Sequence, residues 1–166
     1  MDNHSVPQVV LFGSMKGGWR EEHVIPVLDA LGVSYYNPNE PGIHWNPEKG
    51  QTEAEMMAAC ETIVMVINGI TAAFTSLAEA GWAALGAQQR GQTLILAVLP
   101  EEYAENLPFY LKIFPKVREM NHFLNHYAKS MRNLVRGHAS KFDLPGLIVT
   151  DSIDGVNAAL RQRYGK

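Results

Sequence analysis

Glu79 is the only charged residue in an apolar helical segment, residues 76–89, that follows the third apolar run of the chain. A carboxylate placed in a pocket can act as a nucleophile on a sugar: attack at the anomeric carbon gives a glycosyl-enzyme, which water or another acceptor then cleaves. Near a helix start the dipole should lower the pKa of Glu79 and keep it ionised. The competing interpretation is a capping box, S-x-x-E, in which Ser76 is the N-cap and Glu79 bonds back to its amide.

Such chemistry often needs a second carboxyl group that protonates the leaving group. Glu53 and Glu55 lie in the preceding helical segment, and either one is a candidate. The alternative for both is that they are solvated surface residues.

The first candidate loop, FGSMKGGWRE, follows the first apolar run and is rich in glycine. Gly13 and its neighbours allow close approach of a ligand to the backbone, and amides at a following helix start can hold an anion. The spacing matches neither a phosphate-binding P-loop nor the G-x-G-x-x-G dinucleotide fingerprint. Lys16 and Arg20 are candidates to bind a phosphate or carboxylate; otherwise they are solvated charges.

The second candidate loop, YNPNEPGIHWNPE, combines turn-forming residues with a large aromatic side chain. Asn37 favours a turn. Trp45 is able to stack on a planar ring, or else it covers the edge of the domain. His44 has no second ligand at metal-like spacing, so neither a metal site nor a cofactor is predicted.

Short apolar runs, nearly continuous rather than alternating, indicate parallel strands buried on both faces. They span residues 8–12, 33–36, 63–67, 93–99 and 147–150. Helical patterns at 20–31, 52–60, 76–89 and 152–164 separate them. The alternation predicts a doubly wound α/β fold with a five-stranded parallel sheet of order 2-1-3-4-5. Ligands of such sheets bind beyond the carboxyl ends of the strands at the switch point, here between the first and third strands.

The segment 101–143 is too long to be one simple crossover helix between two strands. Apolar residues recur there at helical spacing, with Pro115 as an interruption, which predicts one or two helices that form a lid, a subunit interface or additional core. We find no repeat or linker, so residues 1–166 are predicted to form one domain with a helical insertion at about 101–143. Ser152 is the predicted N-cap of the last helix.

The composition is that of an ordinary globular protein, with 46% hydrophobic and 19% charged residues among 166. A net charge of -3 argues against a nucleic-acid polymer or an anionic membrane surface as partner. Cys60 is the only cysteine, predicted to be a small core residue, and excludes an intrachain disulfide. No apolar run approaches a membrane span, and the first residues do not resemble a signal peptide, so the expected location is the cytoplasm.

Three segments occur in order at the ends of successive strands: VVLFGSMKGGWRE, YYNPNEPGIHWNPE and ETIVMVINGITAAFTSLAEAGWAAL. Together, over roughly residues 8–100, they resemble the nucleoside 2-deoxyribosyltransferase-like superfamily, most closely its divergent branch. The resemblance implies a flavodoxin-like sheet and cleavage of N-glycosidic bonds of nucleosides or nucleotides, with transfer of the sugar to a base or to water. It also implies a homo-oligomer whose sites borrow side chains from a neighbour.

Residue by residue, the resemblance gives Glu79 the nucleophile's position and Glu53 that of an acid that contacts the base. Gly13 and Ser14 match the loop that lines the nucleoside pocket. The remaining matches are Trp19, Arg20, Asn37, Trp45 and the helix start at Ser76.

This sequence departs from the transferases at residues 70–75, which contain no acid where the transferases carry an acidic pair. Ser14-Met15 also replaces a typical aromatic residue. These departures favour hydrolysis over base exchange. They also keep open a nucleotide-binding or sensing module without chemistry, while the aromatic residues 109–127 keep open a scaffold role.

Overall fold

The computed structural model describes residues 6–39, 46–71, 73–100, 115–141 and 144–165, with side chains left out for residues 115–125. Five parallel strands form one sheet of order β2-β1-β3-β4-β5, as predicted. The strands are β1 (Val9–Gly13), β2 (Tyr35–Tyr36), β3 (Thr62–Ile67), β4 (Thr93–Val98) and β5 (Leu147–Thr150). The central strands β3 and β4 are buried at every position, which explains their continuous apolar sequences.

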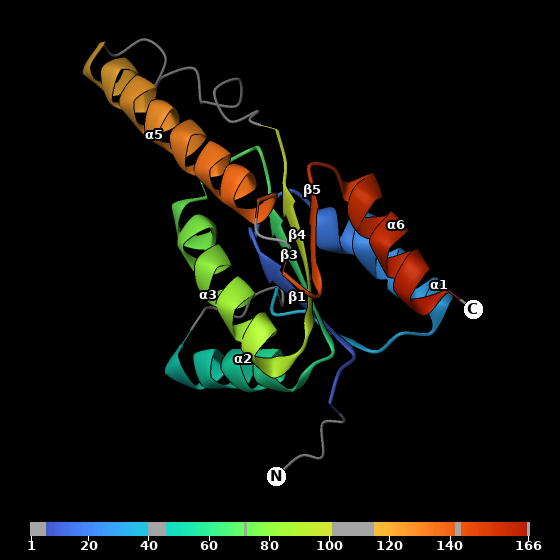
Figure 1. Ribbon diagram of the computed structural model, residues 1–166. Helices are drawn as coiled ribbons and strands as arrows, with labels where there is room; N and C mark the ends of the chain where they lie inside the picture. Colours follow the sequence, from blue (N-terminus) through green and yellow to red (C-terminus); the bar gives the residue numbers. More distant parts are fainter. Residues whose placement is uncertain (1–5, 40–45, 72, 101–114, 142–143, 166) are drawn as a thin grey trace.

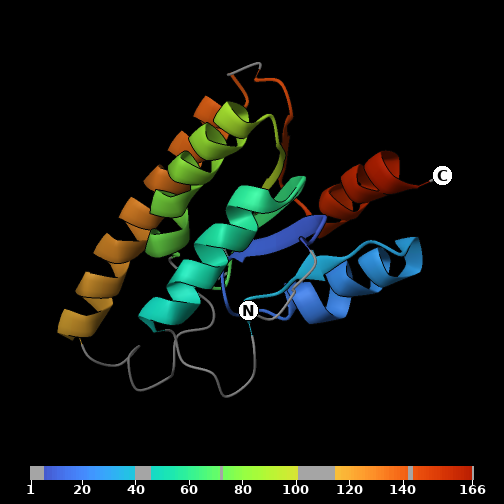
Figure 2. The same cartoon turned by 90° about the horizontal axis from the view of Figure 1, so that it is seen from below.

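Helices cover both faces of the sheet (Figure 1). On one face lie η1 (Trp19–Val24, a π-helical turn), α1 (Ile25–Leu31) and α6 (Ile153–Tyr164); on the other lie α2 (Pro47–Ala59), α3 (Phe74–Arg90) and α5 (Pro115–Ala139). The view from below shows the same three layers (Figure 2).

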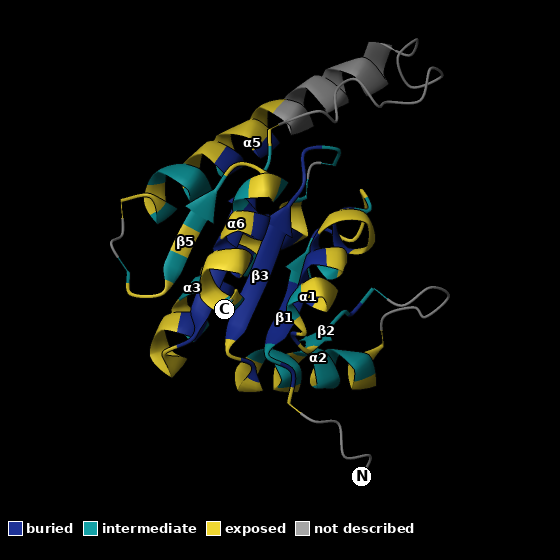
Figure 3. Cartoon of the chain, turned by 90° about the vertical axis from the view of Figure 1, so that its right-hand side faces the viewer, coloured by how far each residue is buried: buried dark blue, intermediate teal, exposed yellow. Residues whose placement is uncertain are grey.

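Alternate residues of each strand enter one of two cores. Val9, Leu11 and Val64 pack toward α1 and α6, whereas Val10, Ile63 and Met65 pack toward α3. Figure 3 shows the result, with β1 and β3 buried between helices whose outer surfaces are exposed. Cys60 belongs to the second core as predicted, and burial raises the pKa of its thiol to about 11.

Helix starts differ from the predicted ones where capping was misjudged. The predicted helix 20–31 is divided into η1 and α1, and α1 begins at Ile25 because Pro26, which has no backbone N–H to donate, is accommodated only in the first turn of an α-helix. The second helix begins at Pro47 rather than at residue 52, because Asn46 caps it by accepting a hydrogen bond from the Lys49 amide at 2.7 Å. Ser152 caps α6 as predicted, through the Gly155 amide at 3.2 Å.

Pro115 begins α5 rather than interrupting a helix, and α5 packs against α3, β4 and β5. The rest of the predicted insertion before Pro115 lies outside the described residues. None of the described helices is long and apolar enough to cross a membrane.

Candidate functional site

A cavity of about 770 Å³ lies at the carboxyl ends of β1 and β3, where the strand order reverses. It is bounded by the loop after β1, by the N-terminal half of α2 and by the first turns of α3. Its lining consists of residues 12–16, Arg20, Pro38, Lys49, Glu53, Thr71, residues 73–76 and Glu79. Seven of the ten residues predicted to form the site are among them.

Gly13 brings the first loop against β3. Its φ of +103° is unfavourable for other residues, and a Cβ there would collide with the carbonyl oxygen of Val66. The next amide, that of Ser14, donates to the same oxygen at 2.8 Å. The Ser14 hydroxyl accepts from the Asn68 amide at 3.1 Å. The loop is therefore held directly over the end of the neighbouring strand.

Trp19 and Arg20 hold this loop in place through the backbone carbonyl of Ser14. Both side chains are buried, and the guanidinium lies 4.1 Å from the indole ring centre. The indole N–H and Arg20 Nη1 each donate to the Ser14 carbonyl at 2.7 Å. Burial lowers the pKa of Arg20 to about 10, which leaves it cationic at neutral pH. Arg20 lines the cavity and adds positive charge, whereas Trp19 is not among the described lining residues and acts on the site through Ser14.

The second loop contributes less than predicted. Asn37 does not line the cavity among the described residues: its amide nitrogen donates to Glu21 at 3.2 Å and its oxygen accepts from the Asn39 amide at 3.0 Å. This turn places the adjacent Pro38 in the lining. Trp45 and His44 lie outside the described residues.

The start of α3 corrects the capping-box interpretation. The helix begins at Phe74 with Ala73 as N-cap in a left-handed conformation, φ 52° and ψ 33°. The Leu77 amide makes the first helical bond to the Ala73 carbonyl at 2.9 Å. Ser76 is thus inside the first turn, and Glu79 lies beyond that turn and lines the cavity.

The predicted lowering of the Glu79 pKa is wrong. Burial raises the pKa of this half-buried carboxyl, and the negative charge of Glu53 raises it further. The helix dipole acts mainly within the first turn, which Glu79 does not occupy.

Of the two acidic candidates on α2, Glu53 lines the cavity, whereas Glu55 is exposed and accepts from Gln51 at 2.7 Å. Burial also raises the pKa of Glu53, against the opposing effects of Lys49 and then Arg20. Lys49 is a lining residue that the sequence prediction missed. Its i, i+4 spacing to Glu53 would have indicated it, had the helix been started at Pro47.

Arg132 of α5, which the sequence analysis did not single out, holds the loop after β3. Arg132 of α5 is fully buried and donates to the carbonyls of Asn68 at 2.5 Å and Thr71 at 2.8 Å. Asn68 in turn donates to the Lys16 carbonyl and accepts from the Thr71 hydroxyl at 3.3 Å. Both loops at the cavity are thereby joined to each other and to α5.

The cavity therefore combines two partly buried carboxyls with three nearby cations, Lys16, Arg20 and Lys49. This arrangement suits a polar ligand that has an electrophilic carbon near Glu79 and a negative group near the lysines. Within the described residues, no group of three or more histidine, cysteine or acidic side chains is arranged to hold a metal ion.

Comparisons with known proteins agree with this fold. A family model described as nucleoside 2-deoxyribosyltransferase like matches residues 6–100, more than half of the chain and all of the cavity lining. A crystal structure of a conserved protein from Enterococcus faecalis V583 superposes with a TM-score of 0.50 and 13% identity, covering 96% of this chain and 99% of that chain, and it supports the fold alone. None of the curated proteins matches. From the extent of the family match, the chain belongs to the nucleoside 2-deoxyribosyltransferase-like family.

Proposed function

We propose that this protein cleaves the N-glycosidic bond of a nucleoside or nucleotide, with Glu79 as nucleophile and Glu53 as proton donor, and with water as the preferred acceptor. The observation that carries the proposal is that both carboxyls, from two different helices, line one cavity at the switch point of the sheet. Family membership supplies the substrate class.

In the first step a Glu79 carboxylate oxygen attacks C1′ as the C1′–N bond breaks. The electron pair of that bond leaves with the base, which takes a proton from Glu53. In the second step water attacks C1′ of the glycosyl ester, Glu79 leaves as a carboxylate, and the proton of the water returns to Glu53. The products are free base and a sugar with a C1′ hydroxyl, and no cofactor is required.

In the free protein the charge on Glu53 favours the shared proton on Glu79, so the proposed roles require that the bound substrate place this proton on Glu53. Burial raises the pKa of both carboxyls, and the charge on Glu53 further raises that of Glu79. Two such groups titrate as a pair, and the singly protonated pair contains one carboxylate to attack and one proton to give. The rate should therefore fall when the pair becomes either fully protonated or fully ionised.

Lys16 and Lys49 favour a substrate with a 5′-phosphate, because both line the cavity and each presents a compact positive charge. Substitution of either lysine by alanine should raise KM for a nucleotide more than for the corresponding nucleoside. Equal effects on both substrates would argue for a nucleoside as the natural ligand.

The test is release of free base from a panel of nucleosides and nucleotides, followed by chromatography. Glu79→Gln and Glu79→Ala should remain folded and lose roughly 10⁴-fold or more in rate, as removal of a nucleophile does in other enzymes. Glu55→Gln is the matched control, since this exposed α2 carboxylate lies away from the cavity lining. Full activity of Glu79→Gln would contradict the proposal.

A nucleotide-binding module without chemistry is the second candidate. Its supporting observation is that Thr71, Ala73, Phe74 and Thr75 line the cavity where the transferases carry acidic residues. Thermal stabilisation by nucleotides without any release of base would favour it.

A further inference from the structure

The two carboxyls of the candidate cavity differ in the cations that act on them. Lys49 and then Arg20 lower the pKa of Glu53 against the effect of its burial, whereas the pKa of Glu79 is raised by burial and by the charge of Glu53. The difference follows from position. Lys49 and Glu53 are four residues apart in α2 and share one face of that helix, while Glu79 belongs to α3. The two cations therefore act on the Glu53 side of the cavity.

Arg20 contributes a fixed positive charge to that side. Its side chain is buried, lines the cavity and donates to the backbone carbonyls of Leu11, Gly13 and Ser14. A guanidinium has more N–H donors than these three bonds use, so part of its hydrogen-bonding capacity is available to a ligand in the cavity. Because its pKa is about 10, Arg20 keeps its charge at neutral pH.

The other charged groups around Glu53 have less influence on it. Lys16, in the loop after β1, also lines the cavity, but it is not among the charges that shift the pKa of either carboxyl. Glu48 and Glu55 of α2 are exposed and do not belong to the described lining. Glu21 of η1 accepts hydrogen bonds from two asparagine side chains, at 3.2 and 3.1 Å. An anion bound by Lys49 and Arg20 would thus act chiefly on Glu53.

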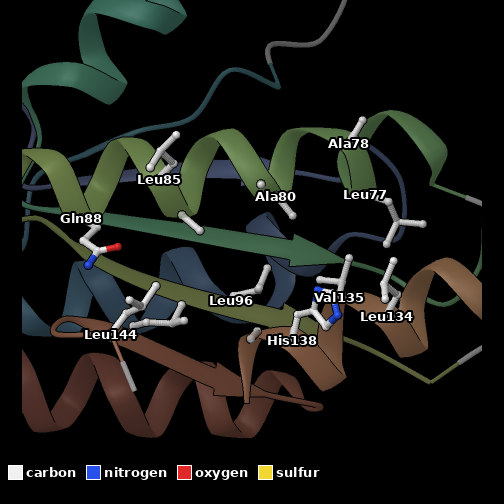
Figure 4. Close-up of a pocket in the computed structure, with 14 residues that line it drawn as sticks. Leu77, Ala78, Ala80, Leu85, Gln88, Leu96, Leu134, Val135, His138 and Leu144 are labelled. Carbon is white, nitrogen blue, oxygen red and sulfur yellow. The ribbon is translucent and has the colours of Figure 1, made fainter. Parts of the chain in front are cut away.

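A second hollow in the described part of the chain lacks such cations. It is an apolar groove of about 460 Å³ between α3 and α5, with Leu85, Leu96 and Leu134 among its lining residues (Figure 4). Its described lining contains no lysine or arginine, whereas the candidate cavity has three such residues. A small inorganic anion such as sulfate should therefore bind in the candidate cavity rather than in the groove.

We propose that the negative charge of the substrate, a phosphate group bound by Lys49 and Arg20, moves the proton of the carboxyl pair from Glu79 to Glu53. This inference rests on the proposed function. Without the anion the two cations favour ionised Glu53, and the proton stays on Glu79, which then cannot attack. When the anion cancels their effect, Glu79 loses the proton and becomes the carboxylate nucleophile, Glu53 gains it and becomes the acid, and the net charge of the pair is unchanged. A nucleotide should thus be cleaved faster than its nucleoside at saturation, besides being bound more tightly.

The test that does not depend on activity is a pH titration followed by NMR of isotope-labelled glutamate side chains. Glu53 is measured in Glu79→Gln and Glu79 in Glu53→Gln, because coupled groups do not give individual pKa values. Sulfate, which stays dianionic throughout the titration, is compared with chloride at equal ionic strength to control for screening. Sulfate should raise the pKa of Glu53 by more than that of Glu79. Equal shifts, or no shift relative to chloride, would overturn the proposal.

Kinetics of Lys49→Met, with Lys16→Met as the matched control, separate this role from simple affinity. Both lysines line the cavity, but only Lys49 acts on Glu53, and methionine is as good a helix former as lysine. Both variants should raise KM for a nucleotide. Lys49→Met should also raise kcat for the corresponding nucleoside, because loss of this charge favours the proton on Glu53 as an anion does.

Sulfate should raise kcat of the wild type for the nucleoside on the order of tenfold, since each pH unit by which the two pKa values move apart changes the distribution of the proton tenfold. Lys16→Met should keep this activation and Lys49→Met should lose most of it. Changes in KM alone, alike in both variants, would overturn the proposal and leave the roles of Glu79 and Glu53 intact. An active Glu79→Gln would instead overturn the proposed function, while the titration would still decide whether the anion controls Glu53.

Discussion

Arg132→Met should destabilise the protein and loosen the loop after β3, because Arg132 is the residue of α5 that holds this loop. Its guanidinium is fully buried and donates to four carbonyls, those of Ile67, Asn68, Thr71 and Leu99. The bonds to Asn68 and Thr71, at 2.5 and 2.8 Å, are the shortest and involve a charged donor.

The magnitude follows from these contacts. Hydrogen bonds to a charged group contribute about 1.5–3 kcal/mol each, so the two short bonds give roughly 3–6 kcal/mol. Part of this loss is offset, because the Met side chain does not carry the desolvation cost of burying the charged guanidinium. We therefore expect a net loss of about 2–4 kcal/mol. For a domain of this size about 2–4 °C of Tm is lost per kcal/mol, which gives a decrease of roughly 5–15 °C.

The assay is thermal and denaturant unfolding, combined with hydrogen exchange of the segment 68–76. Arg136→Met is the matched control: this half-buried arginine donates to Val98 at 3.1 Å and to Leu99 at 2.9 Å, beyond the end of β4. Exchange in segment 68–76 should rise in Arg132→Met and stay near wild type in Arg136→Met. A Tm close to wild type for Arg132→Met, or equal loop exchange in both variants, would refute the reasoning.

Three further outcomes are expected. Gly13→Ala should lower the free energy of unfolding by about 1–3 kcal/mol through backbone strain, and the collision with Val66 should add to this loss. Gly32→Ala, whose Cβ would meet nothing within 4 Å, should lose less in denaturant unfolding, and equal losses would show that the close approach to β3 is unimportant. Glu53→Gln should lower the rate of base release and should also lower the pKa of Glu79 as followed by NMR, because loss of the Glu53 charge removes one cause of its rise; an unchanged Glu79 pKa would place Glu53 too far away to matter. Glu79→Gln should be more stable than wild type at neutral pH, since a carboxyl whose pKa is raised by folding destabilises the fold once ionised. That advantage should vanish below the ordinary glutamate pKa of about 4.5, where Glu79 is protonated in both states, and its absence at pH 7 would argue against a desolvated carboxyl.

The sheet was predictable because its strands are buried on both faces and so read as continuous apolar runs. β2 is the exception: residues 33–36 were predicted, but only Tyr35 and Tyr36 pair with β1. It is an edge strand with a single neighbour, so pairing ends where β1 begins. The prediction of Ser76 as N-cap was wrong for a different reason. The pattern S-x-x-E does not reveal that the helix already begins at Phe74, with Ala73 as its N-cap.

Some residues of the candidate site could likewise be predicted from the sequence and others could not. Gly13 and Ser14 were predictable because they lie at the end of β1, and Glu79 because α3 begins beyond the end of β3, the strand that pairs with β1. Arg132 was not, because its bond to Asn68 spans 64 residues and depends on how α5 packs across β4. Local patterns carry no information on such a contact.

The most direct test of the central claim is the identity of the residue that becomes glycosylated during turnover. Wild-type protein mixed with a nucleoside or nucleotide that it cleaves, quenched early and digested, should show by mass spectrometry one pentosyl adduct, on the peptide that contains Glu79. Glu79→Gln should show no adduct and no release of base, while Glu55→Gln should resemble wild type. An adduct on another residue, or base release by Glu79→Gln at the wild-type rate, would contradict the assignment of Glu79 as nucleophile.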